Sequence, residues 1–193
     1  APYDYDSGQI DALCAAYRGA GPLQRPFYTS PDVFKADMDR IWRRHWLYAG
    51  HSCLIPQPGD WMTFAIGFDS VIVSRGRDGE IRAFHNTCRH RGSRICREEH
   101  GNGRAFVCPY HAWTYDLAGN VTGIPDERCF PGVRAERPSL AALPLCEKHG
   151  LVWVIATPAA EAATDFDIDP WLGGLGPELA SFGFESWAFY DMR

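Results

Sequence analysis

Two short Cys–His pairs in the middle of the chain constrain its fold more than any other feature. The first pair is Cys88-Arg-His90 and the second is Cys108-Pro-Tyr-His111, with residues 91–107 between them. Two thiols and two imidazoles in such a pattern indicate a metal site. For all four to bind one metal centre, two loops that are distant in sequence must be held side by side by a rigid framework.

The mixture of residue types within each pair favours one kind of metal centre over another. A structural zinc ion binds its four ligands at a single point, and its usual spacings group two cysteines together and two histidines together. In a [2Fe–2S] cluster of the Rieske type, one iron takes two cysteine sulfurs and the other takes two histidine nitrogens. We therefore predict that Cys88, His90, Cys108 and His111 hold a [2Fe–2S] cluster, and zinc remains the alternative.

Charge and hydropathy argue against several other classes of protein. The net charge of −5 argues against nucleic-acid binding. The apolar run at residues 151–156 is too short to span a membrane. The N-terminal segment has no basic start followed by an apolar run, so no signal peptide is expected. We therefore expect a protein of the reducing cytoplasm, with free or metal-bound thiols.

A helical extension is predicted in front of the metal-binding domain, over residues 1–45. Apolar residues recur at helical spacing in two stretches of this segment. In the second stretch, Ser30 and Pro31 are suited to a helix start. The predicted buried face of that helix is Phe34, Met38 and Ile41.

An antiparallel, mainly β domain is predicted over residues 46–157, because short strand-like segments alternate there with turns. Asp78-Gly79 favours a hairpin between two such segments, since glycine tolerates positive φ. Further strand-like segments bracket the second Cys–His pair, so both metal-binding loops are expected at one end of this domain. Residues 158–193 are interpreted as a linker with a short helical turn, followed by an outgoing strand at residues 187–190.

The other cysteines and the arginines have more than one interpretation. Five cysteines without a ligand partner are interpreted as buried structural thiols: Cys14, Cys53, Cys96, Cys129 and Cys146. Residues 82–104 are locally basic, with six arginines against two glutamates, which is either a solvated surface or a docking patch for an acidic electron donor. The six are Arg82, Arg89, Arg91, Arg94, Arg97 and Arg104.

The stretches FHNTCRHRGSRIC and FVCPYHAWTYDLAGNV resemble the oxygenase (α) component of Rieske non-heme iron oxygenases. Within that family, their details are most similar to glycine betaine, stachydrine and choline monooxygenases. Ser93 and Tyr110 stand where high-potential respiratory Rieske proteins carry disulfide-forming cysteines, which argues for a lower potential. Ala112 stands where many family members have glycine, so a positive φ there would strain the second loop.

The resemblance implies a longer protein with further parts. A reductase that uses NAD(P)H, or a ferredoxin, would supply electrons to the cluster. A catalytic domain with a mononuclear non-heme Fe(II), expected beyond Arg193, would use O2 to hydroxylate or N-demethylate a substrate, within a homotrimer. No catalytic residue is predicted in this chain. The alternatives are the α subunit of an aromatic-ring-hydroxylating dioxygenase and a stand-alone Rieske-type electron carrier.

Overall fold

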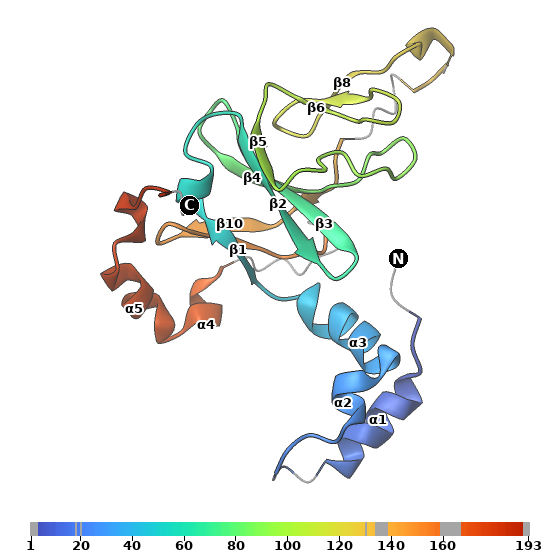
Figure 1. The fold of residues 1–193 in the computed structure, drawn as a ribbon, viewed down its shortest axis with the longest axis vertical. Coiled ribbons are helices and arrows are strands. Elements are labelled where there is room, and N and C mark those ends of the chain that lie inside the picture. The colour runs from blue at the N-terminus through green and yellow to red at the C-terminus, as the bar shows by residue number, and fades with distance from the viewer. Residues whose placement is uncertain are drawn as a thin grey trace. The chain divides into compact units, whose positions relative to one another are not determined.

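The chain forms two compact units in a computed structural model, residues 1–45 and residues 46–193 (Figure 1). The structure describes residues 4–17, 19, 21–129, 131–133, 139–158 and 167–190. No helix among these residues has both the length and the hydropathy needed to cross a membrane.

The first unit is helical. It contains α1 (Ser7–Ala16), α2 (Pro26–Thr29), α3 (Pro31–Asp37) and a π-helical turn (Met38–Trp42). Its core consists of Ile10 from α1 packed with Val33 and Ala36 from α3.

The predicted buried face of the second helix is wrong in two of its three residues. Met38 is buried, but Phe34 and Ile41 are 43% and 48% exposed. The Val33–Ala36 stripe and the Phe34–Met38–Ile41 stripe both have helical spacing, so the pattern alone does not distinguish them. The packing of Val33 and Ala36 with Ile10 decides which stripe is buried.

The second unit is built from three antiparallel sheets. The largest has the order β5-β2-β3-β4-β9, and the smaller two have the orders β1-β11-β10 and β6-β7-β8. All their pairings are antiparallel, which confirms the predicted mainly β fold class. The strands are β1 (Leu47–His51), β2 (Asp60–Ile66), β3 (Asp69–Arg75), β4 (Ile81–His85), β5 (His100–Asn102), β6 (Phe106–Val107), β7 (Thr114–Tyr115), β8 (Val121–Gly123), β9 (Ala142–Leu143), β10 (Leu145–Lys148) and β11 (Leu151–Val154).

The predicted hairpin at Asp78-Gly79 joins β3 to β4, and Gly79 has a φ of 86°. At its other end β4 leads directly into the first Cys–His pair, and the β6–β7 hairpin carries the second. Ile72 from the β3–β4 hairpin, and Phe106 and Tyr115 from the β6–β7 hairpin, share one buried core with Cys88 and Cys108. The sheets therefore anchor both metal-binding loops on one buried core.

Short helices follow the last strand. They are α4 (Asp169–Leu172), α5 (Leu175–Ser181) and the 3-10 turn Phe184–Ser186; two more 3-10 turns lie at Ser52–Leu54 and Glu127–Cys129. The predicted helical turn near residue 177 thus lies within α5. The strand predicted at residues 187–190 is wrong, because this segment pairs with no strand among the described residues. Strand formation requires a partner for the main-chain groups, whatever the local propensity.

Candidate metal centre

The two Cys–His loops share one backbone arrangement. In the first loop, the Cys88 carbonyl accepts from the Gly92 N–H at 2.9 Å and the Cys88 N–H donates to the Ser93 carbonyl at 2.8 Å. In the second loop, Cys108 makes the same two bonds, with Ala112 at 2.9 Å and Trp113 at 2.8 Å. Each loop is thus a closed turn that begins at a cysteine and holds its histidine in place.

Both turns close through a residue in the left-handed region. Gly92 has a φ of 73° and Ala112 a φ of 55°. The resemblance to the family led us to expect glycine at position 112. The positive φ of Ala112 agrees with that expectation, because this backbone region favours glycine. An L-residue in this region costs about 1–2 kcal/mol, so the second loop carries a modest strain that the first loop does not.

The two cysteine sulfurs lie together at the bottom of the site. Cys88 and Cys108 are each 2% exposed, and their side chains interact with one another. Burial raises the pKa of the Cys88 thiol. At Cys108 burial acts in the same direction, but the Tyr110 and His111 N–H groups, which donate to its sulfur, lower the pKa overall. Main-chain N–H groups pointing at a sulfur stabilise a thiolate, which is the form that binds metal.

The two imidazoles form the outer half of the site. The rings of His90 and His111 are 4.7 Å apart between centroids and meet edge to face. Trp113 stacks on His90 with nearly parallel planes, at 5.0 Å. Tyr110 packs on His111 at 3.8 Å. The aromatic neighbours restrict the rotation of both imidazoles.

This donor set fits a two-iron group better than a single ion. His90 Nδ1 is buried and has no hydrogen-bond partner among the described residues, so it is free to bind a metal. Two sulfurs in one pair and two imidazoles in another pair match a cluster with two ligands per iron.

Tyr115 connects the core to the sulfur of Cys88, a role that the sequence analysis did not assign. Its side chain is fully buried, and its hydroxyl lies 3.2 Å from Cys88 Sγ. The hydroxyl accepts the Arg89 N–H at 3.0 Å, which leaves its own proton for the sulfur. Burial and the contact with Cys88 raise the pKa of the Tyr115 phenol. The alternation of buried Trp113, Tyr115 and Leu117 was the available signal for an inward-facing side chain.

Asn86 closes the base of the first loop, and the sequence analysis missed this role too. Its side chain is 2% exposed. The amide oxygen accepts from the N–H groups of Ile95 and Cys96 at 3.0 and 2.9 Å. The amide nitrogen donates to the Cys96 carbonyl at 2.7 Å and to Ser70 Oγ at 3.1 Å. One side chain therefore joins the two ends of the loop that carries Cys88 and His90.

The remaining cysteines differ in burial, and none of the seven forms a disulfide. Burial raises the pKa of Cys96 to about 12, so this thiol stays protonated in the core. Cys53 and Cys146 are half-buried. The expectation of buried thiols is wrong for Cys14 and Cys129, which are exposed. Cys14 has helical spacing with Ile10, but only Ile10 packs in the core.

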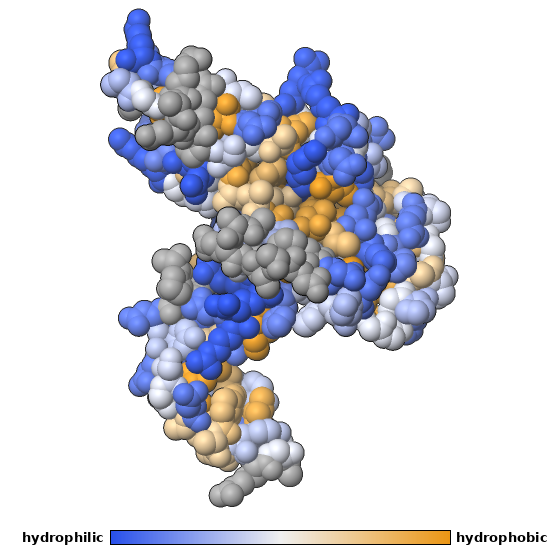
Figure 2. Space-filling view, turned by 180° about the vertical axis from the view of Figure 1, so that it is seen from behind, coloured by the Kyte–Doolittle hydropathy of each residue, from blue (hydrophilic) through white to orange (hydrophobic). Residues whose placement is uncertain are grey.

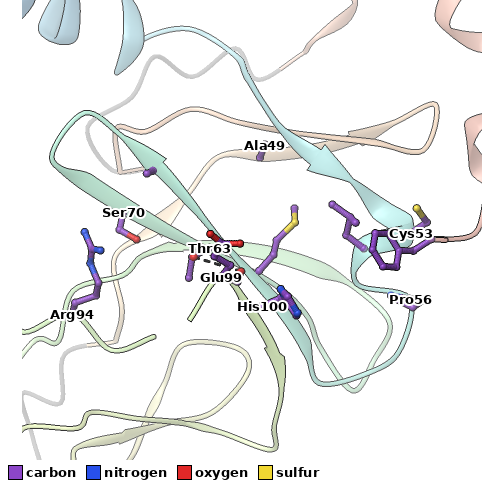
Figure 3. A pocket seen from close by; sticks show the side chains of 12 residues that line it. Ala49, Cys53, Pro56, Thr63, Ser70, Arg94, Glu99 and His100 are labelled. Carbon is purple, nitrogen blue, oxygen red and sulfur yellow. Dashed lines mark hydrogen bonds between the residues drawn. The ribbon is translucent and has the colours of Figure 1, made fainter. Parts of the chain in front are cut away.

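A cleft of about 520 Å³ lies elsewhere on the second unit (Figure 3). Leu54, Met62 and Ala65 are among its apolar lining residues, and it contains none of the four predicted ligands. In Figure 3, Arg94 and Ser70 lie toward one end of the cleft, and Cys53 and Pro56 lie toward the other.

A family model, described as the Rieske [2Fe-2S] domain, matches residues 45–144. The chain belongs to the Rieske [2Fe–2S] domain family. The resemblance found in the two loop motifs is thereby confirmed. The residues that match the family model include both Cys–His loops and the strands that carry them. A Rieske domain binds a [2Fe–2S] cluster.

Relatives of this Rieske domain are subunits of oxygenases. The chain is 47% identical over 117 residues to the biphenyl 2,3-dioxygenase subunit alpha of Rhodococcus jostii (strain RHA1), covering 60% of this chain and 25% of that protein. It is 48% identical over 99 residues to the glycine betaine monooxygenase oxygenase subunit of Pseudomonas aeruginosa (strain UCBPP-PA14), covering 51% of this chain and 23% of that protein.

A solved structure has a similar fold. The apo form of the quaternary ammonium Rieske monooxygenase CntA matches with a TM-score of 0.72 and 28% identity, covering 81% of this chain and 44% of that one. The matched part of this chain spans about a quarter of the length of each of the two oxygenase subunits named above.

Proposed function

We propose that Cys88, His90, Cys108 and His111 hold a [2Fe–2S] cluster that serves as the electron-transfer centre of an oxygenase α subunit. The observation that carries the proposal is the pairing of two buried sulfurs beneath two half-buried imidazoles, one of which has an unpartnered buried Nδ1. A cluster of this type accepts and releases one electron at a time, at a higher potential than a cluster with four thiolate ligands.

The residues of this chain have separate tasks in that role. Cys88 and Cys108 supply thiolates from the core, where the Tyr115 hydroxyl and main-chain N–H groups stabilise their charge. His90 and His111 supply neutral imidazoles near the surface, oriented by aromatic packing. Burial of the sulfurs excludes water from that half of the site, while the imidazoles remain within reach of a partner.

The longer protein is part of the same proposal. We infer that a reductase dependent on NAD(P)H, or a ferredoxin, supplies electrons, and that residues 158–193 lead toward a catalytic domain with a mononuclear iron. The relatives include both a glycine betaine monooxygenase and a biphenyl dioxygenase subunit. Hydroxylation or N-demethylation of a quaternary ammonium compound and dihydroxylation of an aromatic ring are therefore the two candidate reactions. A homotrimer in the cytoplasm remains a prediction.

The cluster assignment is tested by replacing one ligand and one matched cysteine. Cys108→Ser should abolish the visible absorption and the EPR signal of a Rieske cluster after anaerobic reconstitution. Cys129→Ser removes an exposed thiol outside the loops and should leave both signals unchanged. Iron and labile sulfide are measured in the same samples.

Two results would contradict the proposal. The first is a normal Rieske spectrum in Cys108→Ser. The second is a colourless, EPR-silent protein that contains stoichiometric zinc, because zinc has no redox chemistry and no d–d absorption.

A further inference from the structure

The cleft of Figure 3 has no part in the proposed electron transfer. Its volume of about 520 Å³ lies within the range of roughly 300–1,000 Å³ that is usual for ligand pockets. Leu54, Met62 and Ala65 belong to its apolar lining, and a few polar side chains stand among them. A mostly apolar hollow with a small number of polar groups is typical of a site for a small molecule.

A β-bulge and a short neighbouring strand create the space. The pairing of β1 with β11 shifts register between Tyr48 and Gly50, so Ala49 is an extra residue that lines the cleft. On β2, the pairing with β5 covers Asp60–Met62, and Ala65 beyond it is exposed. Bulges are common beside functional sites. The small residues at both positions leave room that larger side chains would fill.

One end of the cleft is positively charged. Arg94 lies at that end, beside Ser70 (Figure 3). Arg94 is exposed, and the ion pairs among the described residues do not include it. Arg82, by contrast, is paired with Asp78 at an N–O distance of 2.6 Å. The guanidinium of Arg94 is therefore available to an anion that enters the cleft.

Ser70 offers a second donor at the same end. Its Oγ accepts from Asn86 Nδ2 at 3.1 Å, which leaves its own proton to donate. Ala65 is the cross-strand partner of Ser70, so the two side chains share one face of the sheet. A guanidinium and a hydroxyl beside an apolar wall match a carboxylate attached to an apolar body.

The rest of the cleft disfavours a second negative charge. Glu99 lines the cleft near Thr63, away from Arg94 (Figure 3). The Thr63 N–H donates to the Glu99 carbonyl at 2.7 Å, which fixes this segment of the chain. A compound with a carboxylate at each end would bring one of them near Glu99 or onto apolar side chains, and either contact is unfavourable.

We propose that this cleft binds an apolar monocarboxylic acid, with its carboxylate at Arg94 and Ser70 and its hydrocarbon part against Leu54, Met62 and Ala65. The inference goes beyond electron transfer and does not depend on it, because none of the four predicted metal ligands lines the cleft. Hydrophilic residues, in blue, cover much of the molecule on the face that Figure 2 displays, whereas hydrophobic residues, in orange, gather in a smaller part of it. A hydrocarbon chain is held only where apolar side chains gather around a hollow.

Binding at this site also affects the first metal-binding loop. Arg94 belongs to that loop, and Asn86 joins Ser70 to the N–H groups of Ile95 and Cys96. A bound carboxylate holds Arg94 and gives Ser70 a further partner. Local opening of the loop should therefore become rarer when the cleft is occupied.

The test measures binding of octanoate to the purified protein by isothermal titration calorimetry. Hexanoate, 1-octanol and octanedioate are the shorter, neutral and doubly charged comparisons. The variants are Arg94→Gln, which removes the charge, and Ala65→Phe, which fills the apolar part. Arg97→Gln is the matched control for Arg94→Gln, because Arg97 is exposed in the same loop and does not line the cleft.

Octanoate should bind with a Kd on the order of 0.1–1 mM. Hexanoate should bind about tenfold more weakly, because two buried methylenes are lost. Octanedioate and 1-octanol should also bind about tenfold more weakly than octanoate.

Among the variants, Arg94→Gln and Ala65→Phe should each weaken octanoate about tenfold or more. Arg97→Gln should stay within about twofold of the unaltered protein. Octanoate should slow hydrogen exchange in peptides covering residues 86–97 of the unaltered protein, and it should not do so in Arg94→Gln.

Several results would overturn this ligand site. They are no binding of octanoate, equal binding of 1-octanol or octanedioate, unchanged binding in Arg94→Gln or Ala65→Phe, or an equal loss in Arg97→Gln. The comparison among ligands uses the unaltered protein, so it does not depend on how a variant folds. A missing cluster spectrum counts against the proposed function alone, because binding to the cleft is measured independently of the metal centre.

Discussion

Replacing Asn86 should destabilise the first metal-binding loop more than its single amide group suggests. In Asn86→Ala, the N–H groups of Ile95 and Cys96 and the carbonyl of Cys96 lose their partner together. Ile95 and Cys96 are 5% and 8% exposed, so water does not readily replace the amide. A buried main-chain group left unpaired costs about 1–3 kcal/mol, and three such groups with partial relaxation give about 3–5 kcal/mol.

That loss is a large part of the roughly 5–15 kcal/mol by which a domain is stable. It corresponds to a fall of roughly 6–20 °C in Tm for a chain of this size. Differential scanning fluorimetry of the anaerobic protein measures this shift. Hydrogen exchange followed by mass spectrometry on peptides covering residues 86–97 measures the local loss. The matched control is Asn102→Ala, an exposed amide, which should change the free energy of unfolding by less than about 1 kcal/mol.

Asn86→Asp distinguishes this hydrogen-bond argument from a loss of side-chain volume. A carboxylate keeps both acceptor bonds but faces the Cys96 carbonyl without a proton to donate. Burial raises the pKa of such a carboxyl above its unfolded value, so its stabilising contribution is largest at low pH and is lost as pH rises through the folded pKa. The free energy of unfolding that Asn86→Asp loses relative to the unaltered protein should therefore be smaller at about pH 5.5 than at about pH 8. An Asn86→Ala protein that melts within about 2 °C of the unaltered protein would refute the reasoning.

Two further predictions concern the loop backbone and the sulfur environment. Ala112→Gly should stabilise the protein by about 0.5–1 kcal/mol, because relief of left-handed strain exceeds the added entropy of the unfolded chain. Gly92→Ala should have the opposite effect, since no atom lies within 4 Å of the added Cβ and only the φ of 73° opposes it; thermal melts that gave both changes the same sign would be inconsistent with this account. Tyr115→Phe should lower the reduction potential by roughly 40 mV, or about 1 kcal/mol, because the hydroxyl stabilises the more negative reduced site. Potentiometric titration beside Tyr110→Phe, whose ring is exposed, measures this, and an equal shift in both variants would rule out a specific bond to Cys88.

Local sequence signals predicted much of the β unit, because its turns and strands depend on neighbouring residues. The Asp78-Gly79 turn predicted the β3–β4 hairpin, and glycine at positive φ explains its success. The spacing of the two Cys–His pairs predicted their joint site, because ligand chemistry restricts the residue types at each position. The resemblance to the family identified Ala112 as an unusual residue in its loop, and its φ of 55° explains why glycine suits this position.

Long-range contacts decided what the sequence left open. Whether Phe34 or Val33 is buried depends on Ile10 in another helix, and both stripes have the same period. Asn86 and Tyr115 acquire their roles from partners elsewhere in the chain. Alternation in the sequence indicates that Tyr115 faces inward, but it does not identify Cys88 as its partner, and nothing local identifies the partners of Asn86. The arginines appeared as one cluster in sequence but diverge in space, because the chain folds back between them and pairs Arg82 with Asp78. Candidate ligands can thus be predicted from local sequence, whereas burial, hydrogen-bond partners and surface charge are properties of the packed molecule.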